Sequence, residues 1–407
     1  MRRLDRQAGI ALTVLGVAIL VVVVLTTPWD VMAGAPTVPP DPAQDFTSAQ
    51  IARSRAFDAA TSVPSYLSLG LTVVFAGLLV ATPLGARLLR GLKGPWWLRV
   101  VLGVVVLTAV VEVLRWPLGM WFETELRAFG LSTQNWWSWT GDRLKSIGVR
   151  VALLSVMVLA IVGLARRFRR WWVPVAAGAF VLTVGASFVY PVVFEPIFND
   201  FAPMPAGELR TELLDLARRA DVPVEDVLVA DASRRTTALN AYVSGFGATR
   251  RIVVYDTLLE APDKEVELII AHELGHATYD DVLHGTLVGG LGAAFGAVLL
   301  FCVAPLWRRP LSDPLAVGAV MGFLSLATVL SGPAQNLVSR HVEARADLHA
   351  LDLTRDPRTF IAMQKRLAVT NISDLSPDAV EYVLYASHPT APQRISMARS
   401  WELMNAP

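Results

Sequence analysis

The sequence of 407 residues contains a single cysteine, Cys302, and only 17% of its residues are charged. One cysteine excludes an intrachain disulfide framework and a metal site built mainly from thiolates. Soluble globular proteins carry charge on about a quarter of their residues, so this chain is poor in charge for that class. Its formal net charge of +1 gives no reason to expect a nucleic-acid partner.

Histidine is also scarce, with six in the chain, yet two of them fall in the stretch I-I-A-H-E-L-G-H at residues 269–276. His272 and His276 are four residues apart, so on a helix both imidazoles project from one face and can bind one metal ion. Glu273 is adjacent, where it can take a proton from a metal-bound water. Two imidazoles, a carboxylate and an open water position form a common catalytic zinc set, so we expect one Zn²⁺ per chain.

Long apolar runs dominate the rest of the sequence. Seven of them approach or exceed the roughly 20 residues that cross a bilayer, at residues 10–27, 66–86, 100–120, 151–165, 171–194, 285–306 and 315–338. The first resembles a signal peptide, but its apolar core is longer and six more runs follow, so we interpret it as a retained helix. Glu112 and Arg115 interrupt the third run and are three residues apart, so on a helix they could pair; the alternative is that this helix ends early, near the membrane interface.

Basic residues are concentrated in alternate loops between these runs. They precede the first run (Arg2, Arg3, Arg6) and recur at positions 87–99, 166–170 and 308–309, whereas the other loops are poorer in them. The positive-inside rule therefore predicts a cytoplasmic N-terminus, with residues 195–283 and the C-terminal tail outside the cytoplasm. An even number of runs separates these two segments, so whatever the orientation they lie on the same side.

The polar segments predict a small mixed domain. Residues 28–65, rich in proline, alanine and aspartate, predict an exposed connection that shows helical periodicity only at residues 50–60. Residues 206–221 predict an amphipathic helix. Strands are predicted at residues 227–230, 241–246 and 252–255. Asp263 is a plausible N-cap of the helix that carries H-E-x-x-H. No glycine or proline breaks the sequence between positions 277 and 284, so this helix can continue to the sixth run.

Two histidines leave a catalytic zinc one protein ligand short. The nearby or later residues of suitable chemistry are Glu343, Asp347, His341, His349, His284 and His388. Asp280 and Asp281 are further residues that could orient a ligand, and the sequence does not choose between them.

The motif and its spacing resemble a known family. H-E-L-G-H at residues 272–276, a hydrophobic hairpin, and E-A-R-A-D at residues 343–347 are similar to the integral-membrane zinc metallopeptidases of the type I CAAX prenyl endopeptidase family. The heat-shock protease HtpX is a more distant relative with fewer spans. The segment N-A-Y-V-S-G at residues 240–245 resembles the family's edge strand, and His388-Pro389 with Arg394 resembles its late H-P…R element.

This resemblance implies a fold and a site. The fold is mostly α, a multi-pass membrane protein of about seven transmembrane helices with a small α+β zincin-like metallopeptidase domain. It implies Glu343 as the third zinc ligand. Asp347, one helical turn further, can then accept a hydrogen bond from a ligand imidazole. We expect His388 to stabilise the oxyanion, Arg394 to position it or the substrate, and Asn240 and Tyr242 to lie on the strand that binds an extended peptide.

The predicted division of the chain follows. Residues 1–194 form a membrane region with five spans, 195–283 a catalytic segment, 284–338 a two-span hairpin, and 339–407 a helical segment that completes the active site. We expect a zinc metalloendopeptidase in the cell membrane that cuts peptides or membrane proteins, CAAX-protease-like or in membrane-protein quality control. The alternative is a non-proteolytic transporter or scaffold with a structural zinc site, which would be closed by four protein ligands.

Overall fold

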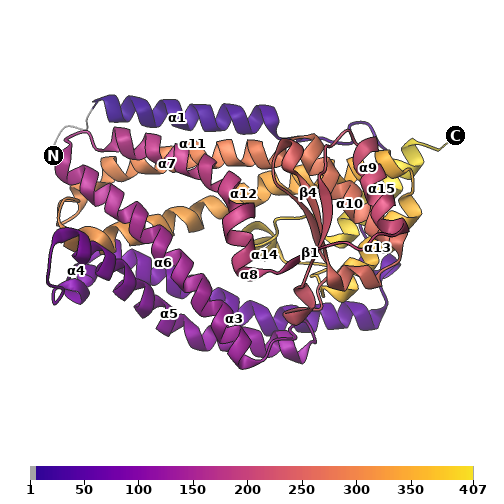
Figure 1. Ribbon diagram of the computed structural model, residues 1–407, viewed down its shortest axis with the longest axis horizontal. Helices are drawn as coiled ribbons and strands as arrows, with labels where there is room; N and C mark the ends of the chain where they lie inside the picture. Colours follow the sequence, from indigo (N-terminus) through magenta and orange to yellow (C-terminus); the bar gives the residue numbers. More distant parts are fainter. Residues whose placement is uncertain (1–5, 407) are drawn as a thin grey trace.

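The structure is a computed structural model that describes residues 6–406. Seven helices in this range are long and apolar enough to cross a membrane, so the predicted number and order of spans are confirmed. Figure 1 shows them running along the long axis of the molecule, with a small sheet and its helices gathered at one end. The seven are α1 (Arg6–Thr26), α3 (Ser48–Ala81), α5 (Trp96–Ala128), α6 (Trp136–Arg167), α7 (Trp172–Val189), α11 (Asp281–Val303) and α12 (Val317–Thr354).

Several of these helices extend well beyond the predicted apolar runs. The helix α3 has 34 residues, about 51 Å at 1.5 Å per residue, against a hydrocarbon core of about 30 Å. It begins at Ser48, where Thr47 and Gln50 form a capping box. The exposed connection predicted over residues 28–65 therefore ends at Thr47, and the helical periodicity at residues 50–60 belongs to the polar first turns of α3, which extend the membrane helix outside the apolar core.

Glu112 and Arg115 do not form the pair that their spacing allows; each is hydrogen-bonded to another helix. Glu112 is buried and accepts hydrogen bonds from Arg143 at 3.0 Å and from Arg150 at 2.6 Å, both on the neighbouring helix α6. Arg115 instead donates from Nε to Ser68 of α3 at 2.8 Å.

The domain at the end of the bundle is built on a four-stranded sheet. The strands lie in the order β1-β2-β4-β3, with β2 and β4 parallel and the outer pairs antiparallel. They are β1 (Phe201–Pro203), β2 (Asp226–Ala230), β3 (Ala241–Ser244) and β4 (Arg251–Tyr255). The three predicted strands are confirmed to within two residues, and the three-residue strand β1 escaped prediction. The strand β3 lies at the edge of the sheet.

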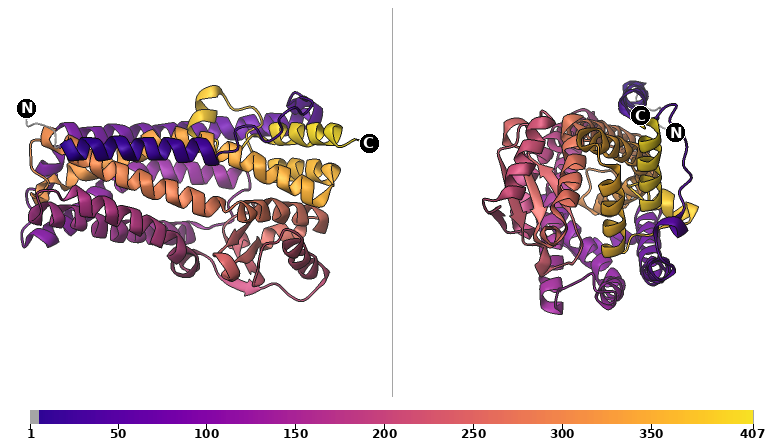
Figure 2. Two further views of the ribbon diagram at one scale, coloured as in Figure 1. Left: turned by 90° about the horizontal axis from the view of Figure 1, so that it is seen from above. Right: turned by 90° about the vertical axis from the view of Figure 1, so that its right-hand side faces the viewer.

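Two helices, at residues 208–219 and 263–278, pack against this sheet, and the C-terminal helices pack against the second of these and against α12. Figure 2 shows that the C-terminal helices lie at the same end of the molecule as the sheet. The remaining α-helices are α9 (Glu208–Arg219), α10 (Asp263–Thr278), α13 (Pro357–Thr370), α14 (Ala379–Leu384) and α15 (Ala391–Met404), together with the short helices α2 (Pro42–Asp45), α4 (Leu84–Leu89) and α8 (Glu195–Phe198). The predicted amphipathic helix at residues 206–221 is thus confirmed as α9.

One hydrophobic core joins the sheet, α9, α10 and the C-terminal helices. Leu213 of α9, Ile252 of β4, Ile270 of α10 and Phe360 of α13 are fully buried within it. Burial of an aliphatic or aromatic side chain contributes about 1.5–3 kcal/mol, so these contacts fix α10 firmly in the domain. The apolar residues of α10 therefore hold its histidines in a set orientation.

The predicted continuation of α10 into the sixth span is wrong. The helix α10 ends at Thr278 and α11 begins at Asp281, with Asp280 between them in the left-handed conformation at φ +50°. Aspartate is one of the few residues other than glycine that adopts this conformation as a single residue. The chain therefore turns at Asp280 without the glycine or proline that usually marks a helix break.

Candidate metal centre

The centre is formed where α10 approaches α12. His272 and His276 lie one turn apart on α10, and their Nε2 atoms are 3.2 Å apart. An added Cβ at Gly275 would come within 3.2 Å of the Ala346 Cα on α12. Glycine at this position therefore lets the two helices come close enough for a side chain of α12 to reach both histidines.

Glu343 is that side chain. Its Oε2 lies 3.1 Å from Nε2 of His272, and its Oε1 lies 3.6 Å from Nε2 of His276. Each of the three residues offers one ligand atom, and these atoms lie within 4.8 Å of one another. The structure thus brings Glu343 to the two histidines, as the family resemblance implied. Three of the four other histidines considered as ligands face elsewhere: His341 packs against Trp29, His349 packs against Tyr279, and His284 faces the Tyr279 carbonyl.

The three donors fit a tetrahedral metal ion. Ligand bonds of 2.0–2.1 Å at tetrahedral angles separate the ligand atoms by about 3.3 Å, close to the spacings found here. Both histidines present Nε2 to the group, while their Nδ1 atoms face carboxylates. An Nδ1 proton on each ring can be donated to its carboxylate, so Nε2 is the atom that a metal would bind once that nitrogen is deprotonated.

Asp347 orients the first histidine. Its Oδ1 lies 2.9 Å from Nδ1 of His272, and its side chain is fully buried. Arg394 of α15 holds this carboxylate, with Nε 2.7 Å from Oδ2. Burial disfavours the charged imidazole, but the hydrogen bonds with Asp347 and Glu343 outweigh it and raise the pKa of His272 to about 10. A metal that binds at this group must therefore displace a proton.

Glu273 lies beside the three donors His272, His276 and Glu343 but is not one of them. Burial raises the pKa of its carboxyl group, and the two histidines oppose that shift. A carboxylate whose pKa is moved towards neutrality is suited to accept a proton and then release it. Together with His276, Glu273 lines a pocket of about 350 Å³.

The same pocket is bounded on its other side by β3. Tyr242 and Val243 of this strand and Phe246 of the following turn line it. Burial raises the pKa of the Tyr242 hydroxyl, so this residue is an uncharged wall of the pocket. Asn240 does not line the pocket; its side-chain oxygen accepts a hydrogen bond from the backbone N–H of Ala241 at 3.0 Å.

His388 lies at the exposed side of the group, in the loop before α15. Its Nε2 is 3.3 Å from Oε1 of Glu343, and its Nδ1 is 2.9 Å from the hydroxyl of Ser387. Its side chain is 57% exposed, and burial of the rest lowers its pKa. His388 is therefore next to the metal group and open to a substrate.

The sequence analysis did not choose between Asp280 and Asp281, and it gave no role at the site to Arg345. Asp281 lies 2.9 Å from Nδ1 of His276, and Arg345 holds its other carboxylate oxygen. Asp280 instead has an exposed side chain, which pairs with Arg250 at 2.8 Å and lines the same pocket as Glu273. No spacing rule predicted the contact of Asp281, because it depends on the turn at Asp280.

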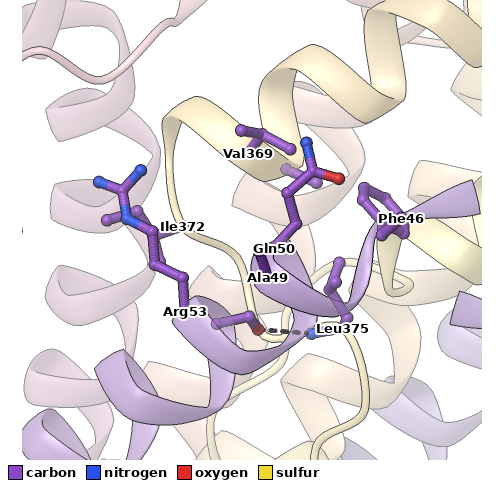
Figure 3. Close-up of a pocket in the computed structure, with 9 residues that line it drawn as sticks. Phe46, Ala49, Gln50, Arg53, Val369, Ile372 and Leu375 are labelled. Carbon is purple, nitrogen blue, oxygen red and sulfur yellow. Dashed lines mark hydrogen bonds between the residues drawn. The ribbon is translucent and has the colours of Figure 1, made fainter. Parts of the chain in front are cut away.

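A second pocket, of about 170 Å³, lies between α3 and α13. Figure 3 shows it lined by Phe46, Ile372 and Leu375, with a hydrogen bond from the Leu375 N–H to Ser54 at the base. Its one charged residue, Arg53, points away from Phe46 and Leu375 and donates to the Phe129 carbonyl at 2.8 Å. This pocket therefore lacks an acid, a base or a metal ligand.

Comparison with known proteins gives consistent matches. Residues 203–402 match the family model for peptidase family M48, and residues 30–200 match the one described as "CAAX prenyl protease N-terminal, five membrane helices". An uncharacterized metalloprotease, YhfN, of Bacillus subtilis is 31% identical over 75% of this chain and 74% of its own length.

The CAAX prenyl protease 1 homologue of rice is 30% identical over 66% of this chain, and the yeast CAAX prenyl protease 1 is 28% identical over 66%. The chain spans slightly less than two thirds of these two relatives, at 65% and 64% of their lengths. The crystal structure of S. mikatae Ste24p superimposes with a TM-score of 0.78, at 20% identity, over 96% of this chain and 98% of that one. The two molecules therefore share one fold.

Proposed function

The chain belongs to the CAAX prenyl protease-like integral-membrane metalloproteases of peptidase family M48, and from this premise we propose that it cleaves peptides with one zinc ion held by His272, His276 and Glu343. The convergence of these three donors from two helices, with Glu273 beside them, is the observation that carries the proposal. In this proposal, the membrane scaffold is formed by residues 1–194 and 284–338. The active site is built from two segments, residues 195–283 and 339–407.

A zinc ion held by these three residues would supply a Lewis acid, which would polarise the scissile carbonyl and lower the pKa of a bound water so that it can be deprotonated near neutral pH. Glu273 takes the proton from the attacking water and passes it to the leaving amine nitrogen. Asp347, held by Arg394, fixes His272 with its Nε2 towards the metal position. His388 donates a hydrogen bond to the oxyanion of the tetrahedral intermediate from its exposed position next to Glu343.

The substrate binds as an extended strand along β3. In the antiparallel pair of β3 and β4, every second residue forms backbone hydrogen bonds with the other strand. The hydrogen bond from the Tyr255 N–H to the Asn240 carbonyl shows which residues these are. The backbone groups of Ala241 and Val243 therefore point away from β4, towards the open edge. A peptide that pairs there passes the pocket with Glu273 and His276.

Because several relatives are named CAAX prenyl protease, we propose prenylated C-terminal peptides as the first class of substrate. Unmodified membrane proteins are the second class that we propose. The charge bias of the loops supports an extracytoplasmic site, because five spans separate the N-terminus from α10. The basic residues Arg2 and Arg3, which contribute to that bias, lie outside the described residues.

The alternative of a structural zinc site in a transporter or scaffold is disfavoured by the donor set. A structural site is closed by four protein ligands, whereas three residues of the described chain meet at this centre. The test that separates the two functions is the Glu273→Gln variant, which should keep its zinc and lose peptide cleavage.

A further inference from the structure

Asp281, the first residue of α11, contacts the second histidine of the metal group. Its Oδ2 is 2.9 Å from Nδ1 of His276, and its side chain is 9% exposed. A carboxylate only accepts hydrogen bonds, so Nδ1 of His276 carries the proton in this contact. That tautomer leaves Nε2, which faces His272 and Glu343, free to bind a metal.

Arg345 holds the other oxygen of this carboxylate. Its Nη2 donates to Oδ1 of Asp281, and its guanidinium lies over the ring of Tyr279 at 4.3 Å from the ring centroid. Arg345 belongs to α12, two residues after Glu343, and its side chain is 19% exposed. Asp281 is therefore held from the helix that also supplies the carboxylate of the metal group.

The arrangement repeats the one around the first histidine. There, Asp347 faces Nδ1 of His272 at 2.9 Å, and Arg394 donates to Asp347 at 2.7 Å. Each imidazole is thus backed by a buried carboxylate, and each carboxylate by an arginine from another helix. In the family pattern used above, only the first of these carboxylates belongs to a motif.

The turn at Asp280 makes the second arrangement possible. On an uninterrupted helix, a residue five positions after His276 would lie about 140° further round and could not reach its ring. The left-handed conformation of Asp280 redirects the chain, so Asp281 returns to the face of α10 that carries the histidines. The helix break therefore has a consequence at the metal centre.

We propose that Asp281 is a positioning residue for His276 and that Arg345 holds Asp281 in place. This inference rests on the proposed function, since it assigns the two residues a part in the same metal site. Hydrogen bonds of this kind fix the tautomer and ring orientation of a ligand histidine, and their loss typically lowers metal affinity or activity 10–100-fold. A purely structural link between α11 and α12 would stabilise the fold without changing the metal site.

Neighbouring Asp280 provides a matched control. It carries the same side chain one residue earlier but is 54% exposed and pairs with Arg250. Asparagine also adopts the left-handed conformation, so Asp280→Asn should preserve the turn. Asp281→Asn and Asp280→Asn thus remove one negative charge each at adjacent positions, and only the first touches a proposed ligand.

The experiment uses the full-length protein in detergent, loaded with zinc or with cobalt. For each variant we would measure the rate at which a chromophoric chelator removes zinc, the visible spectrum of the Co²⁺ form, and the thermal unfolding of the metal-free protein. We expect Asp281→Asn to release zinc at least 10-fold faster and to shift the Co²⁺ spectrum, with Asp281→Ala more affected. Asp280→Asn should match the wild type in both readouts.

Arg345 is tested by coupling. Arg345→Met should also accelerate zinc release, and the double variant with Asp281→Asn should be little worse than Asp281→Asn alone, because Arg345 acts through that carboxylate. Independent, multiplicative effects would overturn the role given to Arg345.

The outcome also separates this inference from the proposed function. If the wild type binds no zinc and cleaves no peptide, the proposed function fails. If the wild type does both, but zinc release and the Co²⁺ spectrum of Asp281→Asn equal those of Asp280→Asn, the positioning role alone is overturned. A lower unfolding temperature with an unchanged spectrum would likewise reduce Asp281 to a structural link.

Discussion

At the scale of single residues, we propose different roles for the three metal donors and for the two residues beside them. His272, His276 and Glu343 converge on one point, whereas Glu273 and His388 lie beside it. The H-E-x-x-H spacing was sufficient to predict the first pair and Glu273. Glu343 required the family resemblance, because 66 residues and two membrane spans separate it from His276 and no local pattern distinguishes it from other acids.

His388 provides the sharpest test at this scale. If it donates to the oxyanion, His388→Ala should lower kcat by about 10²–10³-fold with little change in KM or in bound zinc. The exposed His284, which faces a backbone carbonyl, is the matched control, and His284→Ala should cleave like the wild type. Loss of zinc from His388→Ala would make His388 a ligand, and unchanged kcat would remove it from the mechanism.

At the scale of elements, hydropathy predicted where helices cross the membrane but not where they end. The apolar runs are set by the thickness of the bilayer, whereas the polar turns of α3 and α12 beyond it follow from packing against the domain. The break between α10 and α11 was missed because Asp280 takes a conformation that sequence patterns attribute to glycine. Because this break brings Asp281 to His276, the contact between the two residues could not be predicted without predicting the turn.

The edge strand β3 carries the prediction for substrate binding. Val243→Pro removes a backbone donor on the open edge, and the residue makes no ladder bond to β4 in the alternation described above. We expect KM for an extended peptide to rise at least about 10-fold, the cost of one to two hydrogen bonds, while zinc content stays unchanged. Steady-state kinetics on a fluorogenic peptide would measure this change.

Val243→Ala is the control for the edge strand, since it shortens the side chain and keeps the N–H group. If Val243→Pro and Val243→Ala have the same KM, peptides do not pair with β3.

At the scale of the whole molecule, two segments on either side of a membrane hairpin meet in one site. The prediction that they lie on one side of the membrane agrees with the position of α10 beside the end of α12 (Figures 1 and 2). The proposed side of the membrane on which the site lies rests on loop charge alone, because the molecule has the same shape in either orientation.

Orientation is tested with the single native cysteine removed. In a Cys302→Ser background, one cysteine introduced at Glu402, exposed at the end of α15, should react in intact cells with a membrane-impermeant maleimide. A cysteine at Arg309, in the loop between α11 and α12, should react only after the cells are opened. The reverse pattern would place the site in the cytoplasm and contradict the inference from charge.

The central claim is that a three-ligand zinc site, with Glu273 as the proton carrier, cleaves peptides. Its most direct test measures bound zinc and peptide cleavage on one preparation each of the wild type, Glu273→Gln and the control Glu267→Gln. Glu267 lies on the same helix, has a side chain that is 14% exposed, and pairs with Lys264 at 2.7 Å. We predict one zinc per chain in all three, with cleavage by Glu273→Gln lower by about 10²–10⁴-fold. Wild-type cleavage by Glu273→Gln, or its loss of zinc, would contradict the account.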